Sequence, residues 1–265
     1  RTIIFRRLKG LEDVIGLTVV DPRMLEHGWE FSAVSKDNPI PELEYLHQLY
    51  TRVDSSYSGR VTVPVLWDKQ QQTIVNNESA EIIRMLNSAF NAFTDNAFDY
   101  SPRHLLDDID QINDGVYHSI NNGVYRAGFA TTQAVYEQAV NELFAALDAL
   151  EARLSSQRYL LGDELTEADW RLFPTLIRFD AVYHGHFKTN RKRLEDYPAL
   201  SSYVRDLYQQ PGVAETVDFD HIKVHYYVSQ RSINPSQVVP LGPELDYSRS
   251  HGREHLSRQE FAHAN

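Results

Sequence analysis

Apolar residues in the first 92 positions switch between helical and strand-like spacing. Ile3, Ile4, Phe5 and Leu8 recur at helical spacing, and the run stops at Gly10, as in a helix that ends at a glycine. Segment 15–20 is rich in β-branched residues and closes at an Asp-Pro pair, which is typical of a strand. The whole pattern predicts helices at 1–10, 43–50 and 79–87, a strand at 15–20, and a hairpin formed by 60–67 and 73–75.

The order helix, strand, helix, strand, strand, helix lacks only a leading strand to be similar to the thioredoxin-like βαβαββα plan. The chain opens on Arg1 with no capping residue before its first helix. We therefore expect a thioredoxin-like domain over residues 1–95 whose first strand is missing from this chain and lies upstream.

From about residue 100 onward the apolar spacing is helical. Thr166 and Asp169 are spaced as a capping box, and Leu165 and Trp170 are placed to form a hydrophobic staple around it. The residues after Pro235 are polar and predict an extended tail. The expected class is α+β, with an all-helical domain at 100–235, a tail at 236–265, and helices at 105–120, 132–155, 168–183 and 200–209.

Charge and composition narrow the function classes. The chain has 265 residues, 37 acidic and 26 basic, so its net charge is −11 with neutral His, and no long Lys/Arg block is present. Nucleic-acid binding is therefore not expected. No apolar run reaches about 18 residues, so no membrane association is expected either. Because the sequence contains no cysteine, disulfides and thiol nucleophiles are excluded within these residues.

Pro64 stands between two strand residues, Val63 and Val65. A cis Val63–Pro64 bond would turn the N–H and C=O groups of Val63 outward as a small bracket for a peptide-like ligand. An ordinary trans proline at a strand edge is the alternative, and spacing alone favours it, because only about 5 to 6% of X–Pro bonds are cis.

Residues 76–79, Asn-Asn-Glu-Ser, precede a predicted helix. The N–H groups and positive dipole end of that helix could bind a carboxylate with help from the Ser79 hydroxyl, while Glu78 could pair with an ammonium group. That combination suits an α-amino acid zwitterion. Plain helix capping is the alternative.

Tyrosine and histidine are the remaining candidates for chemistry. Tyrosine hydroxyls can donate to phenolic oxygens while their rings stack on aromatic ligands, although core packing explains any single tyrosine equally well. Two histidine pairs have the i, i+4 spacing of metal ligands but lack the glutamate of a metalloprotease motif, so no metal is expected. These residues are Tyr125, Tyr183, Tyr226, and the pairs His221/His225 and His251/His255.

Six blocks spread over the chain carry a family resemblance. Residues 59–68 read GRVTVPVLWD, residues 75–84 read VNNESAEIIR, and residues 225–235 read HYYVSQRSINP. Together with the blocks at 1–12, 24–29 and 121–129, these motifs resemble the glutathionyl-hydroquinone reductases, the Xi class of glutathione transferases. The resemblance implies a glutathione-binding thioredoxin-like domain followed by an all-helical domain, and glutathione as co-substrate.

The resemblance also implies a joint site. Val63, beside a cis Pro64, would bracket the cysteinyl unit of glutathione, and Glu78 with Ser79 would hold its γ-glutamyl end. Trp29 matches the tryptophan that the family places beside glutathione. The tyrosines expected on the hydroquinone side are Tyr125, Tyr183 and Tyr226.

The family's catalytic cysteine lies in a Cys-Pro-Trp-Ala turn directly before the first helix, and this chain opens just after that turn. We therefore expect the nucleophile upstream of Arg1, and expect these residues to bind without turnover. The implied protein is a cytoplasmic, dimeric enzyme that reduces S-glutathionyl-hydroquinones through a cysteine–glutathione mixed disulfide. The alternatives are a catalytically silent binding or scaffolding protein and a conventional transferase that uses Tyr or Ser.

Overall fold

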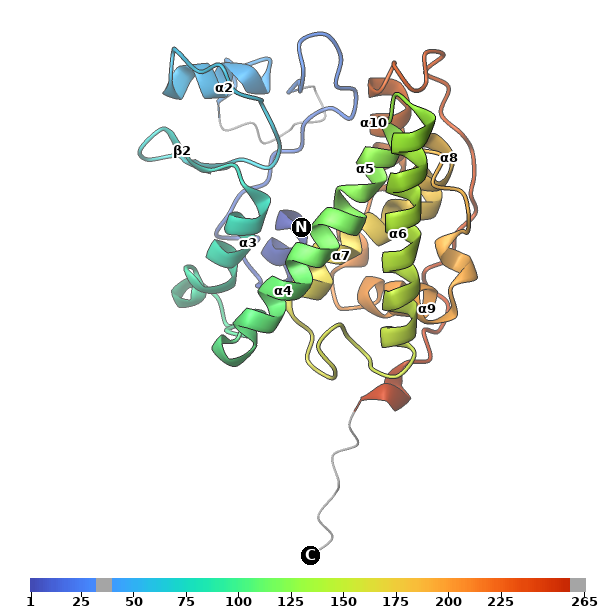
Figure 1. Cartoon of the computed structure of the whole chain (residues 1–265). Helices are drawn as coiled ribbons and strands as arrows, with labels where there is room; N and C mark the ends of the chain where they lie inside the picture. The colour runs from blue at the N-terminus through green and yellow to red at the C-terminus, as the bar shows by residue number, and fades with distance from the viewer. Residues whose placement is uncertain (32–39, 258–265) are drawn as a thin grey trace, which may run out of the picture. The chain divides into compact units, whose positions relative to one another are not determined.

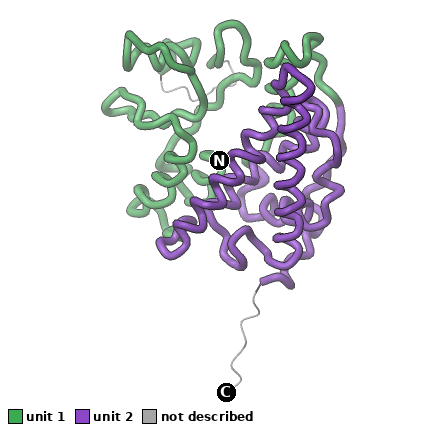
Figure 2. Tube along the Cα trace, viewed as in Figure 1, with its two compact units in different colours: residues 1–98, 216–240 green, residues 99–215, 241–265 purple. Residues whose placement is uncertain are grey.

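The computed structural model describes residues 1–31 and 40–257, which form two compact units. Unit 1 comprises 1–98 and 216–240, and unit 2 comprises 99–215 and the residues from 241 onward (Figure 2). The sequence places 216–235 in the helical domain and treats 236–265 as a separate tail. The structure instead groups 216–240 with the first unit and the described residues after 240 with the second.

Unit 1 contains a small antiparallel sheet and four α-helices among its described residues (Figure 1). Helix α1 packs against α3, and α2 contacts β2. The elements are α1 (Thr2–Leu8), α2 (Leu46–Val53), β1 (Leu66–Asp68), β2 (Thr73–Asn76), α3 (Ser79–Ser88), the 3-10 turn η1 (Asn91–Phe93) and α10 (Phe219–Ser229).

All the regular secondary-structure elements of unit 2 are helices within its described residues (Figure 1). Helix α6 packs against α5 and α9, and α7 packs against α4 and α9. The elements are η2 (Arg103–Leu105), α4 (Leu106–Val116), η3 (Tyr117–Asn121), α5 (Gly123–Gly128), α6 (Gln133–Leu154), α7 (Glu167–Arg178), η4 (Phe179–Tyr183), α8 (His184–His186), η5 (Leu194–Asp196), α9 (Pro198–Tyr208) and η7 (Glu254–Leu256), with η6 (Ala214–Thr216) at the border between the units; η3 and η4 are π-helical.

Helix α1 ends at Leu8 and is followed by Lys9 and Gly10, so the chain leaves the helix at the glycine that the sequence predicts as its stop. Gly10 has φ +61°, the left-handed conformation that glycine adopts most easily. The Gly10 N–H donates to the Arg7 carbonyl, and the Leu11 N–H donates to the Arg6 carbonyl. These are the two hydrogen bonds of a Schellman motif, which satisfies the last carbonyl groups of a helix.

The predicted strand at 15–20 is wrong, because no strand forms there in the described residues. A β-branched segment becomes a strand only when a neighbouring strand accepts its hydrogen bonds. Among the described residues, the sheet consists of β1 and β2 and does not include this segment. The side chain of Arg6 instead donates to the carbonyls of Glu12 and Ile15.

The predicted hairpin is present but shorter. Strand β1 pairs antiparallel with β2, with Trp67 opposite Ile74 and Asp68 opposite Thr73. The Asp68 carboxylate accepts the N–H groups of Gln70 and Gln71, which closes the turn. Residues 60–65 lie outside the sheet.

The predicted capping box at α7 is confirmed. The Asp169 side chain accepts the Thr166 N–H at 2.9 Å, the Leu160 N–H at 2.9 Å and the Tyr203 hydroxyl at 2.7 Å. Burial raises the pKa of Asp169, which the hydrogen bonds from Leu160, Thr166 and Tyr203 oppose. Trp170 is fully buried beside this junction.

Two differences concern the end of the chain. Residues Phe219–Ser229, which contain two His and two Tyr, form helix α10, and the apolar spacing does not predict a helix there. The residues from 241 to 257 have no regular structure except η7, and they are held to unit 2. The Arg253 guanidinium donates to the carbonyls of Leu154, Gln157 and Arg158.

Candidate functional site

The Val63–Pro64 peptide bond is cis. The trans reading that spacing favours is therefore wrong, and the reading that the family resemblance implies agrees with the structure. Pro64 lies just before β1, where the chain has not yet joined the sheet. Val63 is 43% exposed, so the residue is not covered by the core of unit 1.

Glu78 and Ser79 lie at the amino end of α3, as predicted. Glu78 is the N-cap residue: its Oε1 accepts the Ala80 N–H at 3.2 Å and lies 3.5 Å from the Ser79 hydroxyl. Asn76 fixes the backbone just before α3, because its side-chain oxygen accepts the Glu78 N–H at 2.6 Å. The capping alternative is thus observed for Glu78, and a ligand role for Glu78 and Ser79 stays a prediction.

Arg1 adds a cation to the same place. Its guanidinium donates to the Ser79 hydroxyl at 3.1 Å, although the two residues are 78 positions apart in the chain. A guanidinium, a hydroxyl and the positive end of a ten-residue helix together favour a carboxylate. No local sequence pattern connects Arg1 to Ser79, so this contact could not be predicted from the sequence.

Tyr50 joins the two predicted halves of the glutathione site. Its hydroxyl donates to the Thr62 carbonyl at 2.8 Å and accepts from the Asn77 side chain at 3.2 Å. Thr62 directly precedes Val63, and Asn77 directly precedes Glu78. One hydroxyl of a buried helix residue therefore brings the cis-proline segment and the start of α3 within about 6 Å of each other.

Trp29 lies on a segment without helix or strand, so tertiary contacts orient it. The indole packs against the cluster of Ile40, Leu46, Leu49 and Tyr50. Its other neighbour is the His225 imidazole, with ring centroids 4.7 Å apart and planes inclined by 20°. The predicted glutathione-side tryptophan thus belongs to unit 1 together with Val63, Glu78 and Ser79.

Two of the three predicted tyrosines come together in unit 2. The ring centroids of Tyr125 and Tyr183 are 6.0 Å apart, and Phe187 lies 5.3 Å from each of them. Gly128 makes this packing possible, because a Cβ atom there would lie 2.3 Å from the Phe187 ring. These residues form an aromatic cluster at η4 and α5.

Tyr226 belongs to α10 in unit 1, where it is 6% exposed and lies next to His225. The structure therefore assigns the predicted hydroquinone tyrosines to both units. Asp180, three residues before Tyr183, serves the scaffold: its carboxylate accepts the N–H groups of Leu194 and Glu195. Burial raises the pKa of Asp180, and those two hydrogen bonds oppose the shift.

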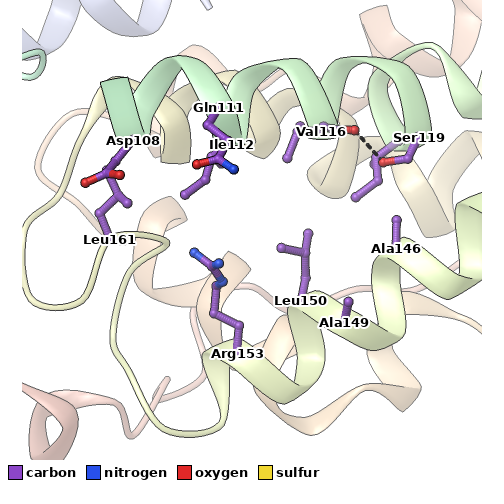
Figure 3. A pocket seen from close by; sticks show the side chains of 12 residues that line it. Asp108, Gln111, Ile112, Val116, Ser119, Ala146, Ala149, Leu150, Arg153 and Leu161 are labelled. Atoms are coloured by element: carbon purple, nitrogen blue, oxygen red, sulfur yellow. Dashed lines mark hydrogen bonds between the residues drawn. The ribbon is translucent and has the colours of Figure 1, made fainter. Parts of the chain in front are cut away.

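A separate hollow of about 390 Å³ lies between α4, η3 and α6 in unit 2 (Figure 3). Ile112, Val116 and Leu150 give it an apolar lining, and the Arg153 side chain extends into it from α6 (Figure 3). None of the eight residues predicted for the glutathione and hydroquinone sites lines this hollow.

Across residues 1–31 and 40–257, no three His, Cys, Asp or Glu side chains gather as metal ligands would. Among the helices of this part of the chain, none is both long and apolar enough to cross a bilayer.

Comparisons with known proteins agree with this geometry. The family described as glutathione S-transferase, N-terminal domain, matches residues 1–89, and the one described as glutathione S-transferase, C-terminal domain, matches residues 133–206. The fold is therefore that of a glutathione transferase, a thioredoxin-like domain followed by an all-helical domain, and the predicted fold class is confirmed.

Close relatives show to which class of glutathione transferases the chain belongs. The chain is 52% identical over 257 residues to the glutathionyl-hydroquinone reductase YqjG of Escherichia coli, covering 96% of this chain and 78% of that protein. It is 51% identical to the glutathionyl-hydroquinone reductase PcpF of Sphingobium chlorophenolicum, covering 92% and 78%. The chain belongs to the Xi class of glutathione transferases, the glutathionyl-hydroquinone reductases.

Solved structures give the same result. The glutathione-bound structure of YqjG matches with a TM-score of 0.93 at 52% identity, covering 95% of this chain and 83% of that one. The Xi-class enzyme from Natrialba magadii matches with a TM-score of 0.93 at 48% identity, covering 96% and 79%.

Proposed function

We propose that this protein uses glutathione to reduce S-glutathionyl-hydroquinones to hydroquinones. The observation that carries the proposal is the 52% identity to YqjG over 96% of this chain. The cis Val63–Pro64 bond and the start of α3, joined through Tyr50, support a glutathione site in unit 1.

Glutathione would bind along unit 1. The peptide groups of Val63 would hydrogen-bond to the cysteinyl unit, as a strand edge does with an added peptide. The γ-glutamyl carboxylate would lie at the start of α3, close to the Ser79 hydroxyl and the Arg1 guanidinium. Glu78 would face the ammonium group, and Trp29 would flank the tripeptide.

The hydroquinone would lie against tyrosines. Tyr125 and Tyr183 already share one aromatic cluster, which suits stacking on a ring and donation to phenolic oxygens. Tyr226 would contribute from α10. These roles rest on the family resemblance and on the residue chemistry.

The reaction needs a thiolate, and no cysteine occurs in the 265 residues. A cysteine in a turn directly before α1 stays our prediction, because a helix amino terminus lowers the pKa of a thiol. Its thiolate would attack the sulfur of the substrate: the carbon–sulfur bond breaks, the hydroquinone carbon takes a proton, and a mixed disulfide forms. A second glutathione would then release glutathione disulfide and restore the thiolate.

The test is turnover of an S-glutathionyl-hydroquinone by the protein that carries the predicted Cys-Pro-Trp-Ala segment. We expect one hydroquinone and one glutathione disulfide for each substrate consumed, measured by chromatography. A matched variant with serine at the predicted cysteine is expected to bind glutathione without turnover. Glutathione binding without turnover by the parent protein would instead favour the binding or scaffolding alternative.

We also propose a homodimer in the cytoplasm, as the family resemblance implies. Sedimentation equilibrium of the purified protein measures the first property, with about twice the chain mass expected. Fractionation of cells that express the protein measures the second, and recovery outside the cytosolic fraction would contradict it.

A further inference from the structure

Helix α10 lies against the loop that carries Trp29, and three hydrogen bonds join them. The His225 Nδ1 lies 2.9 Å from the Pro22 carbonyl. The Ser229 hydroxyl donates to the same carbonyl at 3.2 Å and accepts the Met24 N–H at 2.9 Å. The loop is therefore anchored to α10 a few residues before Trp29.

The contact with Pro22 fixes the imidazole. A carbonyl oxygen only accepts hydrogen bonds, so the His225 Nδ1 carries the proton and donates to it. This hydrogen bond sets the rotation of the ring, and the ring then lies nearly parallel to the Trp29 indole, inclined by 20°. His225 thus presents a fixed aromatic face to Trp29.

Trp29 depends on that face because its own backbone segment is irregular. The Trp29 carbonyl is held by the Leu46 N–H at 2.9 Å, but this bond leaves the side-chain rotamer free. The apolar cluster at α2 supports one side of the indole, and the imidazole covers a face. A binding side chain keeps its geometry only when its neighbours lock its rotamer.

We propose that His225 is a positioning residue for the reductase reaction: its ring holds the Trp29 indole in the orientation that glutathione binding requires. The inference rests on the proposed function, since it assumes that Trp29 flanks glutathione. His225 acts through Trp29 and does not itself touch the reacting atoms. Because α10 also carries Tyr226, with ring centroids of His225 and Tyr226 5.2 Å apart, one helix serves both predicted halves of the site.

Three substitutions separate the stacking role from a merely structural one. His225→Ala removes the ring, His225→Phe keeps an aromatic face without the donor, and His225→Gln keeps a donor without the ring. An aromatic pair contributes about 0.5–1.5 kcal/mol, so we expect His225→Ala to raise the KM for glutathione about three- to tenfold with kcat nearly unchanged. His225→Phe should restore most of the affinity, and His225→Gln should not. His221→Ala, one turn earlier on α10, is the matched control.

A double-mutant cycle with Trp29→Ala gives a second readout. If His225 acts through Trp29, then adding His225→Ala to Trp29→Ala leaves the KM for glutathione unchanged. An unchanged KM in the folded His225→Ala variant, or rescue by Gln rather than Phe, would overturn the proposal. If the alanine variant does not fold, the comparison of Phe with Gln decides. A parent protein that neither binds nor uses glutathione would contradict the proposed function itself.

Discussion

The hydroxyl of Tyr50 holds two segments that are 15 residues apart. It lies between the Thr62 carbonyl and the Asn77 amide, and its ring is 3% exposed. Because buried polar groups lose stability when a partner is removed, this hydroxyl both stabilises unit 1 and spaces the predicted glutathione contacts.

Tyr50→Phe should therefore lower the free energy of unfolding by about 1–3 kcal/mol and weaken glutathione binding. The substitution keeps the ring in its apolar cluster and removes only the oxygen that joins Thr62 to Asn77. Denaturant unfolding and calorimetric titration with glutathione measure the two effects. Tyr57→Phe is the control, because the Tyr57 hydroxyl donates to the carbonyl of Arg60, three residues away in the same segment. Unchanged binding in Tyr50→Phe would contradict the spacing role.

The buried Tyr100 side chain is expected to limit the stability of the fold at alkaline pH. Burial raises the pKa of Tyr100 to about 12, above the value of about 10 expected in the unfolded chain. Between these values the native state keeps a proton that the unfolded state releases, so the stabilisation is complete below about pH 10 and is lost as the pH rises towards 12.

Tyr100→Phe should accordingly raise the midpoint pH of alkaline unfolding, since phenylalanine has no proton to lose. Circular dichroism at a series of pH values measures this midpoint. Tyr117→Phe removes the same hydroxyl from a ring that is 47% exposed and is the matched control. Identical midpoints for Tyr100→Phe and the parent protein would show that another group sets the limit.

At the scale of elements, the start of α7 shows how one carboxylate organises a junction. Asp169 serves the capping box and also accepts from Leu160 and Tyr203, which belong to other segments. Removing a cap residue costs about 1 kcal/mol, but removing Asp169 deprives four buried donors of their acceptor, since the Thr166 hydroxyl donates to it as well.

We therefore expect Thr166→Ala to lower the free energy of unfolding by about 1 kcal/mol and Asp169→Ala to lower it by about 3 kcal/mol or more. Urea unfolding followed by circular dichroism compares the two variants directly. Equal losses would mean that the bonds from Leu160 and Tyr203 add nothing to the capping box.

Sequence periodicity predicts those elements whose ends carry local signals. The helix from Gln133 to Leu154 is preceded by a Thr132 cap, and its bounds differ from the predicted 132–155 by one residue at each end; α3 differs from its predicted range by one residue. The strand at 15–20 failed because β-propensity does not reveal a pairing partner. Helix α10 was missed because its His- and Tyr-rich sequence lacks a clear apolar face.

In the candidate site, too, residues with local sequence signals were predictable and residues with distant partners were not. Local motifs pointed to Pro64, Glu78 and Ser79, since a proline in a strand and polar residues before a helix are visible in one segment. Arg1 and Tyr50 act through partners far away in the chain, so no spacing rule finds them, and the spacing of His225 with His221 does not reveal its contact with Trp29.

On the scale of the whole molecule, each unit is built from two stretches of chain. The second stretch of unit 2 is anchored by Arg253, which is 2% exposed and also donates to the Ala199 carbonyl and the Ser202 hydroxyl. Burial lowers the pKa of Arg253, which the nearby Asp206 opposes. Ala199 and Ser202 belong to α9, and Leu154, another acceptor of Arg253, is the last residue of α6. One side chain therefore ties the tail to both helices.

Arg253→Ala should release residues 241–257 and lower the free energy of unfolding by about 3 kcal/mol or more, because a buried network loses its shared donor. Limited proteolysis should then cut this tail faster than in the parent protein, with mass spectrometry locating the sites. Arg249→Ala, whose partner Glu195 forms an exposed ion pair, is the control and should change little. A tail that resists protease in Arg253→Ala would contradict the anchor.

The placement of α10 in unit 1 bears on how the protein is made. A ribosome releases the chain from its amino end, so residues 99–215 emerge before the helix that covers Trp29 is synthesised. During translation the main body of unit 2 is therefore complete before α10, which follows residue 98 by more than 100 residues, can pack against the Trp29 loop of unit 1. A nascent chain stalled at residue 215 would therefore hold Trp29 without its imidazole partner.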